Sequence, residues 1–269
     1  MAVRPRTASR SPGRWARHVT GIARRHATVA VVVSLAALAL PGGASAAPRA
    51  LAPPSEHGAW VARVIAPVAA RAAPSKPGVV ALLETRARWG GGPVQLLVLD
   101  ASRIRRASQV GGARLWLKVA LPRRPNGSSA WIPADHAQIH FSHWRVELST
   151  ARRRLVVYRG LRVMRSLRVV VGASATPTPH GLFAVDEKIE QRDAGGFLGP
   201  WALHLTAFSE VLDNYGGGPG RVAIHGRGGA SLLDPLGSAR SHGCIRIDNR
   251  DVRWLARVLP LGTPVRIRS

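Results

Sequence analysis

The segment SHGCIRI, from Ser241 to Ile247, contains Cys244, which is the only cysteine among the 269 residues. A single thiol can act as a nucleophile, as a metal ligand or as a small hydrophobic side chain in the core. The choice depends on the compartment in which the protein works and on the residues that surround the thiol.

The N-terminus has the three parts of a secretory signal peptide. Seven arginines and no acidic residue precede the apolar run Ala27–Leu40, and the small residues Ala44-Ser45-Ala46 follow it. We expect residues 1–46 to be a signal peptide, with an uncleaved membrane anchor as the alternative. The run of about fourteen residues is short for a membrane-spanning helix. The protein is then exported to the periplasm or cell wall, and it touches the membrane only if this segment stays uncleaved.

Export bears directly on the role of Cys244. A single cysteine cannot form an internal disulfide bond, so an exported protein exposes this free thiol to oxidising conditions. A purely structural role for the thiol is therefore less favoured than a chemical one.

The chain is strongly basic, with 39 lysines and arginines against 14 acidic residues. The net charge stays at +18 after the seven arginines of the signal segment are removed, since 32 basic residues face the same 14 acidic ones. A basic protein outside the cell meets anionic wall polymers. Nucleic acid is not expected as a partner, because the sequence has no nucleic-acid-binding module and carries an export signal.

The mature chain divides into three parts by composition. Residues 47–78 are rich in Ala, Pro and Arg and are expected to form a linker. Residues 79–140 contain short β-type runs, and the alternation in LWLKVAL (115–121) predicts a half-buried strand. Asn126-Gly127 predicts a tight turn with positive φ that joins this strand to the next. The stretch WLKVALPRRPNGSSAWIPADHA (116–137) resembles the small SH3-like barrels that accompany bacterial wall enzymes.

Residues 141–269 consist of short apolar runs separated by turn residues, which predicts an antiparallel β-sandwich or barrel. One helix is expected after Asp248, a capping residue, because Val252, Leu255 and Leu259 share one helical face. Gly262 ends this helical region, and a last strand follows at 263–267.

Two histidines lie near Cys244 in the sequence. His225 stands at the end of an apolar strand in VAIHGRGG (222–229), and His242 precedes the thiol by two residues. A nearby imidazole and nearby cations lower the pKa of a thiol and make it a better nucleophile. The neighbouring cations are Arg227, Arg240, Arg246 and Arg250. Gly243 leaves backbone amides unobstructed, so that they could stabilise an oxyanion.

The same residues allow two other interpretations. His225, His242 and Cys244 could be three zinc ligands, but the paired short spacings typical of structural zinc sites are missing. For His242 alone, a buried histidine satisfied by backbone hydrogen bonds is the alternative.

The pattern of Ile224-His225-Gly226, fifteen residues and then SHGCIR (241–246) resembles the active-site motif of the L,D-transpeptidase (YkuD-type) catalytic domain. The flanks TPTPHGLF (176–183) and LGTPVRI (261–267) are also similar to this family. The resemblance covers residues 141–269 and implies a β-sandwich enzyme that needs no metal or organic cofactor. It implies an acyltransferase that cross-links peptidoglycan stem peptides through a cysteine thioacyl-enzyme and releases the terminal D-alanine.

The resemblance also implies roles for individual residues. Cys244 is the nucleophile and His225 the general base and acid, with its ring oriented by the backbone carbonyl of Gly226. His242 and the amides of Gly243 and Cys244 line the oxyanion site. Two further residues have supporting roles: Arg246 holds a substrate carboxylate, and Ser241 gives hydrogen-bonding support.

Two other functions compete with cross-linking. The acyl group could pass to water, which would make the protein a carboxypeptidase or wall hydrolase. The protein could also be a non-catalytic wall-binding protein that uses the SH3-like part and its arginines.

Overall fold

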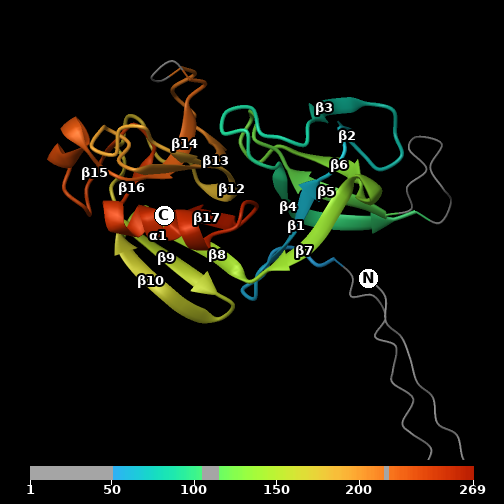
Figure 1. Cartoon of the computed structure of the whole chain (residues 1–269), viewed down its shortest axis with the longest axis horizontal. Coiled ribbons are helices and arrows are strands. Elements are labelled where there is room, and N and C mark those ends of the chain that lie inside the picture. Colours follow the sequence, from blue (N-terminus) through green and yellow to red (C-terminus); the bar gives the residue numbers. More distant parts are fainter. Residues whose placement is uncertain (1–50, 105–114, 215–217) are drawn as a thin grey trace, which may run out of the picture. The chain divides into compact units, whose positions relative to one another are not determined.

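The computed structural model describes residues 51–104, 115–214 and 218–269. The predicted signal peptide lies outside the described residues. The described residues all belong to one compact unit, residues 47–269 (Figure 1). No helix in these described ranges is long and apolar enough to cross a membrane.

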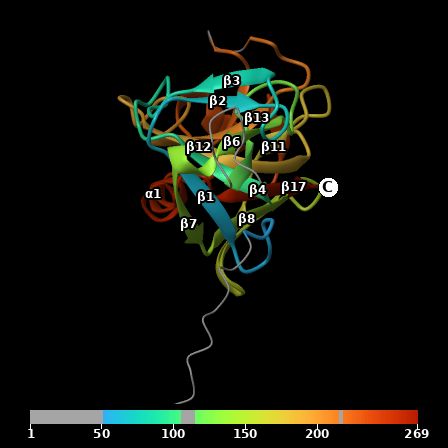
Figure 2. The same ribbon diagram turned by 90° about the vertical axis from the view of Figure 1, so that its right-hand side faces the viewer.

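The N-terminal module, residues 59–142, is a seven-stranded sheet in the order β3-β2-β6-β5-β4-β1-β7. Figure 2 shows β1, β4 and β7 of this sheet from the side of the module. Its strands are β1 (Ala59–Val64), β2 (Val68–Arg71), β3 (Val79–Leu83), β4 (Gln95–Arg103), β5 (Leu115–Ala120), β6 (Ser129–Pro133) and β7 (Ala137–Ser142). A short 3₁₀ turn, Ala134–His136, precedes β7.

The predicted linker at 47–78 is wrong, because β1 and β2 lie within it and are part of the sheet. In β1, Val61 and Ala62 are fully buried, and the strand pairs with both β4 and β7. The alanines of this segment are small strand residues that pack closely against their neighbours. Composition alone could not distinguish them from alanines in a linker.

The hairpin around Asn126-Gly127 is confirmed, since β5 and β6 pair antiparallel and Gly127 has a φ of 79°. The prediction that β5 is half-buried is wrong. Leu117 faces the module's own core, while Ala120 on the other face packs in a small cluster with Ala184 of the C-terminal domain. The second face is thus covered by another domain, which periodicity within one strand cannot reveal.

The C-terminal domain, residues 143–268, contains an eight-stranded sheet in the order β10-β9-β8-β17-β12-β13-β14-β16. These strands are β8 (Trp144–Ser149), β9 (Arg154–Arg159), β10 (Arg162–Arg168), β12 (Gly181–Glu190), β13 (Trp201–Phe208), β14 (Arg221–His225), β16 (Ile245–Arg246) and β17 (Pro264–Arg268). Strands β11 (Val171–Gly172) and β15 (Ala239–Ser241) form a separate pair, and Gly229–Leu233 is a 3₁₀ turn.

Strand β12 divides the large sheet into two layers. Its first half pairs with β17 and its second half with β13, with a register shift between Val185 and Glu187. The core between the layers contains buried side chains from both halves, among them Leu148, Leu155, Leu203 and Ile224. The mainly β architecture is therefore confirmed.

The expectation of an antiparallel sheet holds for most strand pairs but not for all. Strands β17 and β8, β14 and β16, and β11 and β15 pair in parallel. The parallel pair of β14 and β16 positions the site described below.

The predicted helix is confirmed as α1 (Asn249–Val258), and the Asp248 side chain caps it by accepting a hydrogen bond from the Arg250 amide. The helix ends before Leu259 and not at Gly262 as expected. Its buried residues include Val252 and Leu255, which pack into the core between the sheet layers. The capped helix fixes the chain that follows Cys244 and brings Asn249 next to the loop after His225.

Candidate active site

His225 and Cys244 meet because β14 and β16 are parallel neighbours. Ile224 pairs with Ile245 and His225 pairs with Arg246 across these strands. Side chains two residues apart in a strand point to the same face. His225, Arg246 and Cys244 therefore share one face, while Ile224 and Ile245 are buried in the core on the other.

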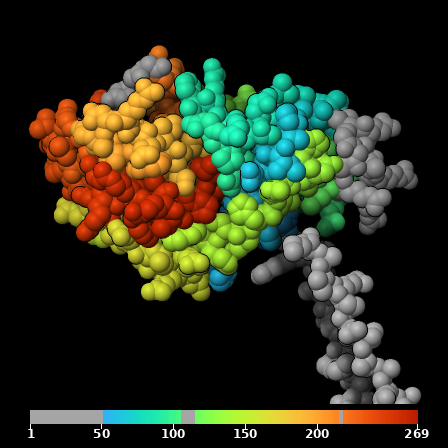
Figure 3. All heavy atoms as spheres, in the orientation of Figure 1, coloured from blue at the N-terminus to red at the C-terminus, as the bar shows by residue number. Residues whose placement is uncertain are grey.

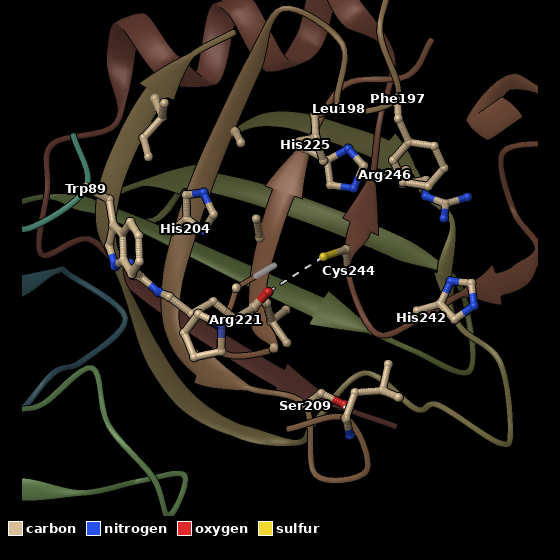
Figure 4. A pocket seen from close by; sticks show the side chains of 18 residues that line it. Trp89, Phe197, Leu198, His204, Ser209, Arg221, His225, His242, Cys244 and Arg246 are labelled. Carbon is tan, nitrogen blue, oxygen red and sulfur yellow. Dashed lines mark hydrogen bonds between the residues drawn. The ribbon is translucent and has the colours of Figure 1, made fainter. Parts of the chain in front are cut away.

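This face lines a cavity of about 360 Å³, within the usual range for ligand sites (Figure 4). Strand β13 contributes His204, which pairs in register with Ala223 of β14. The rest of the lining is mostly apolar and includes Phe197 and Leu198. The sequence-predicted residues His225, His242, Cys244 and Arg246 all line this one cavity.

His225 is held in one orientation by the backbone that follows it. Its Nδ1 lies 2.7 Å from the carbonyl oxygen of Gly226, so the predicted contact is confirmed. A carbonyl only accepts, so Nδ1 carries the hydrogen and Nε2 is the free base. Nε2 is buried and has no hydrogen-bond partner in the described ranges. Burial, with a smaller effect from Arg246, lowers the pKa of His225 to about 4.

The thiol of Cys244 is a weak acid in this cavity. Its Sγ lies 3.9 Å from the backbone carbonyl oxygen of Arg221 (Figure 4). Burial raises the pKa of the Cys244 thiol, and the backbone of Ala223 and the charge of Arg246 oppose this effect less strongly. Arg246 thus lowers this pKa, as expected of a nearby cation, but desolvation outweighs it, so the expected net lowering of the Cys244 pKa is not found. At neutral pH a neutral thiol faces a neutral imidazole.

The turn before Cys244 is held by its own serine. Ser241 Oγ donates to the carbonyl oxygen of Cys244 at 2.6 Å and accepts from the amide of Gly243 at 3.2 Å. Gly243 has a φ of 110°, a conformation that residues with a side chain rarely adopt. The hydrogen bonds expected of Ser241 are thus present, and its supporting role in the reaction stays a prediction.

The upstream TPTP segment braces the same turn from outside. Thr176 Oγ1 donates to the carbonyl of Ser241 at 3.1 Å, and Thr178 Oγ1 donates to the carbonyl of Gly243 at 2.9 Å. Thr178 also accepts from the amide of Gly172. This segment and the cysteine turn are far apart in sequence but form one structural unit.

The predicted oxyanion group is arranged differently from the expectation. The amide of Gly243 is already bonded to Ser241 Oγ, so the Cys244 amide is the better-placed donor of the two. His242 lines the cavity and is exposed to solvent, so its alternative as a buried core histidine is wrong.

Arg246 is almost fully buried, with 3% of its side chain exposed. Its guanidinium forms an ion pair with Asp234 and lies 4.8 Å from the ring centroid of Phe197. A substrate carboxylate would have to share this guanidinium with Asp234. The role of Arg246 in binding a carboxylate stays a prediction.

Several residues of the site were not predicted from the sequence. Asn249 clamps the loop after His225, because its side chain accepts from the amide of Arg227 at 2.7 Å and donates to the carbonyl of the same residue at 2.8 Å. An asparagine beside a helix cap was the only available signal. His204 and Trp89 line the cavity from distant segments and had no local signal.

In the described part of the chain, no three His, Cys, Asp or Glu side chains are grouped so that they could hold a metal ion. The three residues weighed as zinc ligands thus do not form such a group.

Residues 143–267 match the model of the YkuD family, which describes the L,D-transpeptidase catalytic domain. Proteins named as L,D-transpeptidase YkuD from Bacillus licheniformis and Bacillus subtilis are 35% and 33% identical to this chain over 124 residues. The match covers 46% of this chain and only 65% of each relative. The solved structure of L,D-transpeptidase 3 from Mycobacterium tuberculosis with a faropenem-derived adduct is 15% identical, with a TM-score of 0.40. The structural match covers 71% of this chain and 97% of the chain in the solved structure.

Proposed function

We propose that this chain, whose residues 143–267 match the model of the L,D-transpeptidase catalytic domain, is an exported enzyme that cross-links peptidoglycan stem peptides through Cys244. The observation that carries the proposal is the placement of Cys244 beside a histidine with a free, buried Nε2 in one cavity.

The first step forms a thioester on Cys244. The neutral thiol gives its proton to Nε2 of His225 as the sulfur attacks the carbonyl of the residue before the terminal D-alanine. His225 has the low pKa of a neutral base, and Gly226 keeps its Nδ1 proton in place. We expect the Cys244 amide, with His242 at the cavity edge, to stabilise the oxyanion.

The second step reverses the proton transfers. The imidazolium of His225 gives its proton to the departing amine of D-alanine, which leaves the thioacyl-enzyme with a neutral histidine. An amine from a neighbouring stem then attacks the thioester, loses a proton to Nε2 and releases Cys244 as a thiol. The mostly apolar lining of the cavity disfavours water at this stage and favours transfer over hydrolysis.

Export and wall association complete the proposal. The N-terminal signal pattern would place the enzyme outside the cytoplasmic membrane, where its substrate lies. The +18 charge of the remaining chain, from 32 basic and 14 acidic residues, favours association with anionic wall polymers.

The decisive experiment measures the intact mass of the purified protein after incubation with a carbapenem. We expect a one-to-one adduct with the natural chain and none with Cys244→Ser. The products formed from stem tetrapeptides are then analysed. Cross-linked dimers support transfer, and trimmed monomers alone indicate hydrolysis. Absence of the adduct in a folded protein with a reduced thiol would contradict the proposal and favour the wall-binding alternative.

A further inference from the structure

A hairpin of the N-terminal module forms one wall of the cavity that contains Cys244. We call residues 84–94, between β3 and β4, the Trp89 hairpin. It is closed by hydrogen bonds from the Ala87 amide to the Gly92 carbonyl at 2.8 Å and from the Val94 amide to the Thr85 carbonyl at 2.9 Å. Its Trp89 lines the cavity and is 56% exposed. In Figure 4 this ring lies across the cavity from Cys244 and His225.

The tip of the Trp89 hairpin is anchored to the C-terminal domain. The Gly90 amide donates to one carboxylate oxygen of Glu187, and the other oxygen accepts from Arg221 at 2.9 Å. Glu187 is only 4% exposed, so this contact is shielded from water. Arg221 also provides the carbonyl oxygen that faces Cys244 Sγ. The hairpin is thus bonded to Glu187 of β12 and is linked through it to Arg221, the residue of β14 whose carbonyl faces the nucleophile.

A second cavity, of about 900 Å³, adjoins the first at the Trp89 hairpin. Trp89, Pro219 and Arg221 line both cavities, so the two hollows meet at these residues. The walls of the second cavity come from both domains, whose surfaces adjoin where the hairpin meets the C-terminal domain (Figure 3). A peptide bound beside Cys244 would have to pass Trp89 to reach the second cavity.

The unpaired charges of the second cavity are mainly positive. Arg86, Arg88 and Arg123 line it, and none of them forms an ion pair in the described ranges. Arg88 lies 5.3 Å from the ring centroid of Trp89. Glu84 is the one carboxylate of this lining without an ion pair in those ranges. The other carboxylates there pair with Arg124 or Arg221. A ligand carboxylate is the group that these guanidiniums would recognise.

We propose that the Trp89 hairpin makes the two cavities one extended site for a peptide with a free carboxylate. The reacting residue lies at Cys244, the chain packs against Trp89, and the carboxylate lies among the guanidiniums of the second cavity. The N-terminal module is then part of the substrate site and not a separate wall-binding unit. This inference rests on the proposed function, because the reacting residue belongs to a stem peptide.

The test measures peptide binding by calorimetry on the full chain with Cys244→Ala, which binds without reacting. Two synthetic stem-type tetrapeptides end in a diamino acid followed by D-alanine. They are identical except that the side-chain carboxylate at their second position is free in one and amidated in the other. The variants are Trp89→Ala and Arg123→Glu. The controls are Ile65→Ala, which removes an exposed apolar side chain elsewhere in the module, and Arg162→Glu, which reverses an exposed charge on β10.

We expect Trp89→Ala to weaken the binding of both peptides about tenfold, because it removes a central aromatic contact. We expect Arg123→Glu to weaken binding of only the peptide with the free carboxylate, by about fivefold. Both controls should bind the two peptides as tightly as the parent protein does. Unchanged binding of both peptides by Trp89→Ala would overturn the proposal. An equal effect of Arg123→Glu on the two peptides would overturn the carboxylate site.

The binding test separates this inference from the proposed function. If the peptides bind as described but the natural chain forms neither an adduct nor products, the proposed chemistry fails and the extended site stands. If the natural chain reacts but Trp89→Ala binds and turns over both peptides normally, the extended site fails and the chemistry stands.

Discussion

Nδ1 of His225 lies 2.7 Å from the carbonyl oxygen of Gly226, which leaves Nε2 as the one ring nitrogen available to take a proton. His225 is 1% exposed, so water does not compete for the hydrogen bond that fixes the ring. Cys244 is half-buried, and desolvation in the cavity keeps both the thiol and the imidazole in their neutral forms. The site therefore differs from those in which a thiolate and an imidazolium form an ion pair before the substrate arrives.

The first prediction concerns the pH dependence of the thiol. Because burial raises the pKa of Cys244, the rate of its reaction with neutral iodoacetamide should increase only at pH values above the ordinary pKa of a thiol. The rate should show no inflection near pH 6–7, since the pKa of His225 is about 4. Rates of alkylation between pH 5 and pH 10 measure this profile. A rate plateau from pH 5 to pH 8 would indicate a resting thiolate and contradict the neutral pair.

The second prediction concerns stability in mild acid. Burial lowers the pKa of both His204 and His225 to about 4, whereas the unfolded chain takes up these protons near pH 6.5. Stability is thus fully present above pH 6.5 and falls as the pH decreases toward 4. The loss is at most about 3 kcal/mol for each histidine. Asp186 opposes this trend at low pH, because burial raises its pKa.

Urea unfolding at pH 7 and pH 5 tests this trend. We expect the free energy of unfolding to be lower at pH 5, and we expect His204→Gln to show a smaller difference between the two pH values. An equal difference in His204→Gln and the natural chain would show that His204 is not protonated on unfolding in this range.

The third prediction concerns Asn249, which acts on His225 through the loop that follows it. Asn249→Ala removes two hydrogen bonds to the backbone of Arg227 and should lower stability by about 2 kcal/mol. Displacement of His225 should lower kcat by about tenfold or more with little change in KM. Steady-state kinetics and thermal unfolding measure the two effects.

Asn249→Asp is the matched control for this position. Its carboxylate keeps the acceptor for the Arg227 amide but loses the donor to the Arg227 carbonyl, so it should restore part of the lost rate. Equal kcat in Asn249→Ala and the natural chain would show that the clamp has no part in positioning the histidine.

The sequence predicted the local parts of this site better than the distant ones. Cys244, His225 and Ser241 lie in two short motifs, and the strand, turn and helix signals around them are local. The parallel pairing of β14 with β16 then brings the two motifs together. This pairing is a long-range contact, and the motifs themselves indicate it only because they resemble those of a known family. Even so, the state of the thiol was predicted with the wrong sign. The desolvation of a side chain depends on everything packed around it, and neighbouring arginines in sequence do not reveal it.

The N-terminal module shows the same limit on a larger scale. Its hairpin at Gly127 follows from two residues, and this prediction is confirmed. Strand β1 was missed because its alanines match a linker in composition, although Val61 and Ala62 are fully buried. The place of Trp89 in the cavity depends on how two domains pack, and no pattern within residues 84–94 indicates it.

The last prediction concerns the ion pair of Arg246 with Asp234. Arg246 lowers the pKa of both His225 and Cys244, so Arg246→Gln should raise both. Removal of one partner from a largely buried ion pair should also cost roughly 3–5 kcal/mol of stability. Arg246→Lys keeps the positive charge, so its two pKa values should be closer to those of the natural chain than the values in Arg246→Gln are. The pKa of His225 is measured by NMR titration, and that of Cys244 by the alkylation profile.

A further variant separates charge from packing at this ion pair. Asp234→Asn keeps Arg246 but removes its carboxylate partner, so the full cationic charge acts on the cavity and both pKa values should decrease. Opposite shifts in Arg246→Gln and Asp234→Asn would show that Arg246 tunes the pair through its charge. Shifts in the same direction would mean that both substitutions act by loosening the fold, and the electrostatic role of Arg246 would then be wrong.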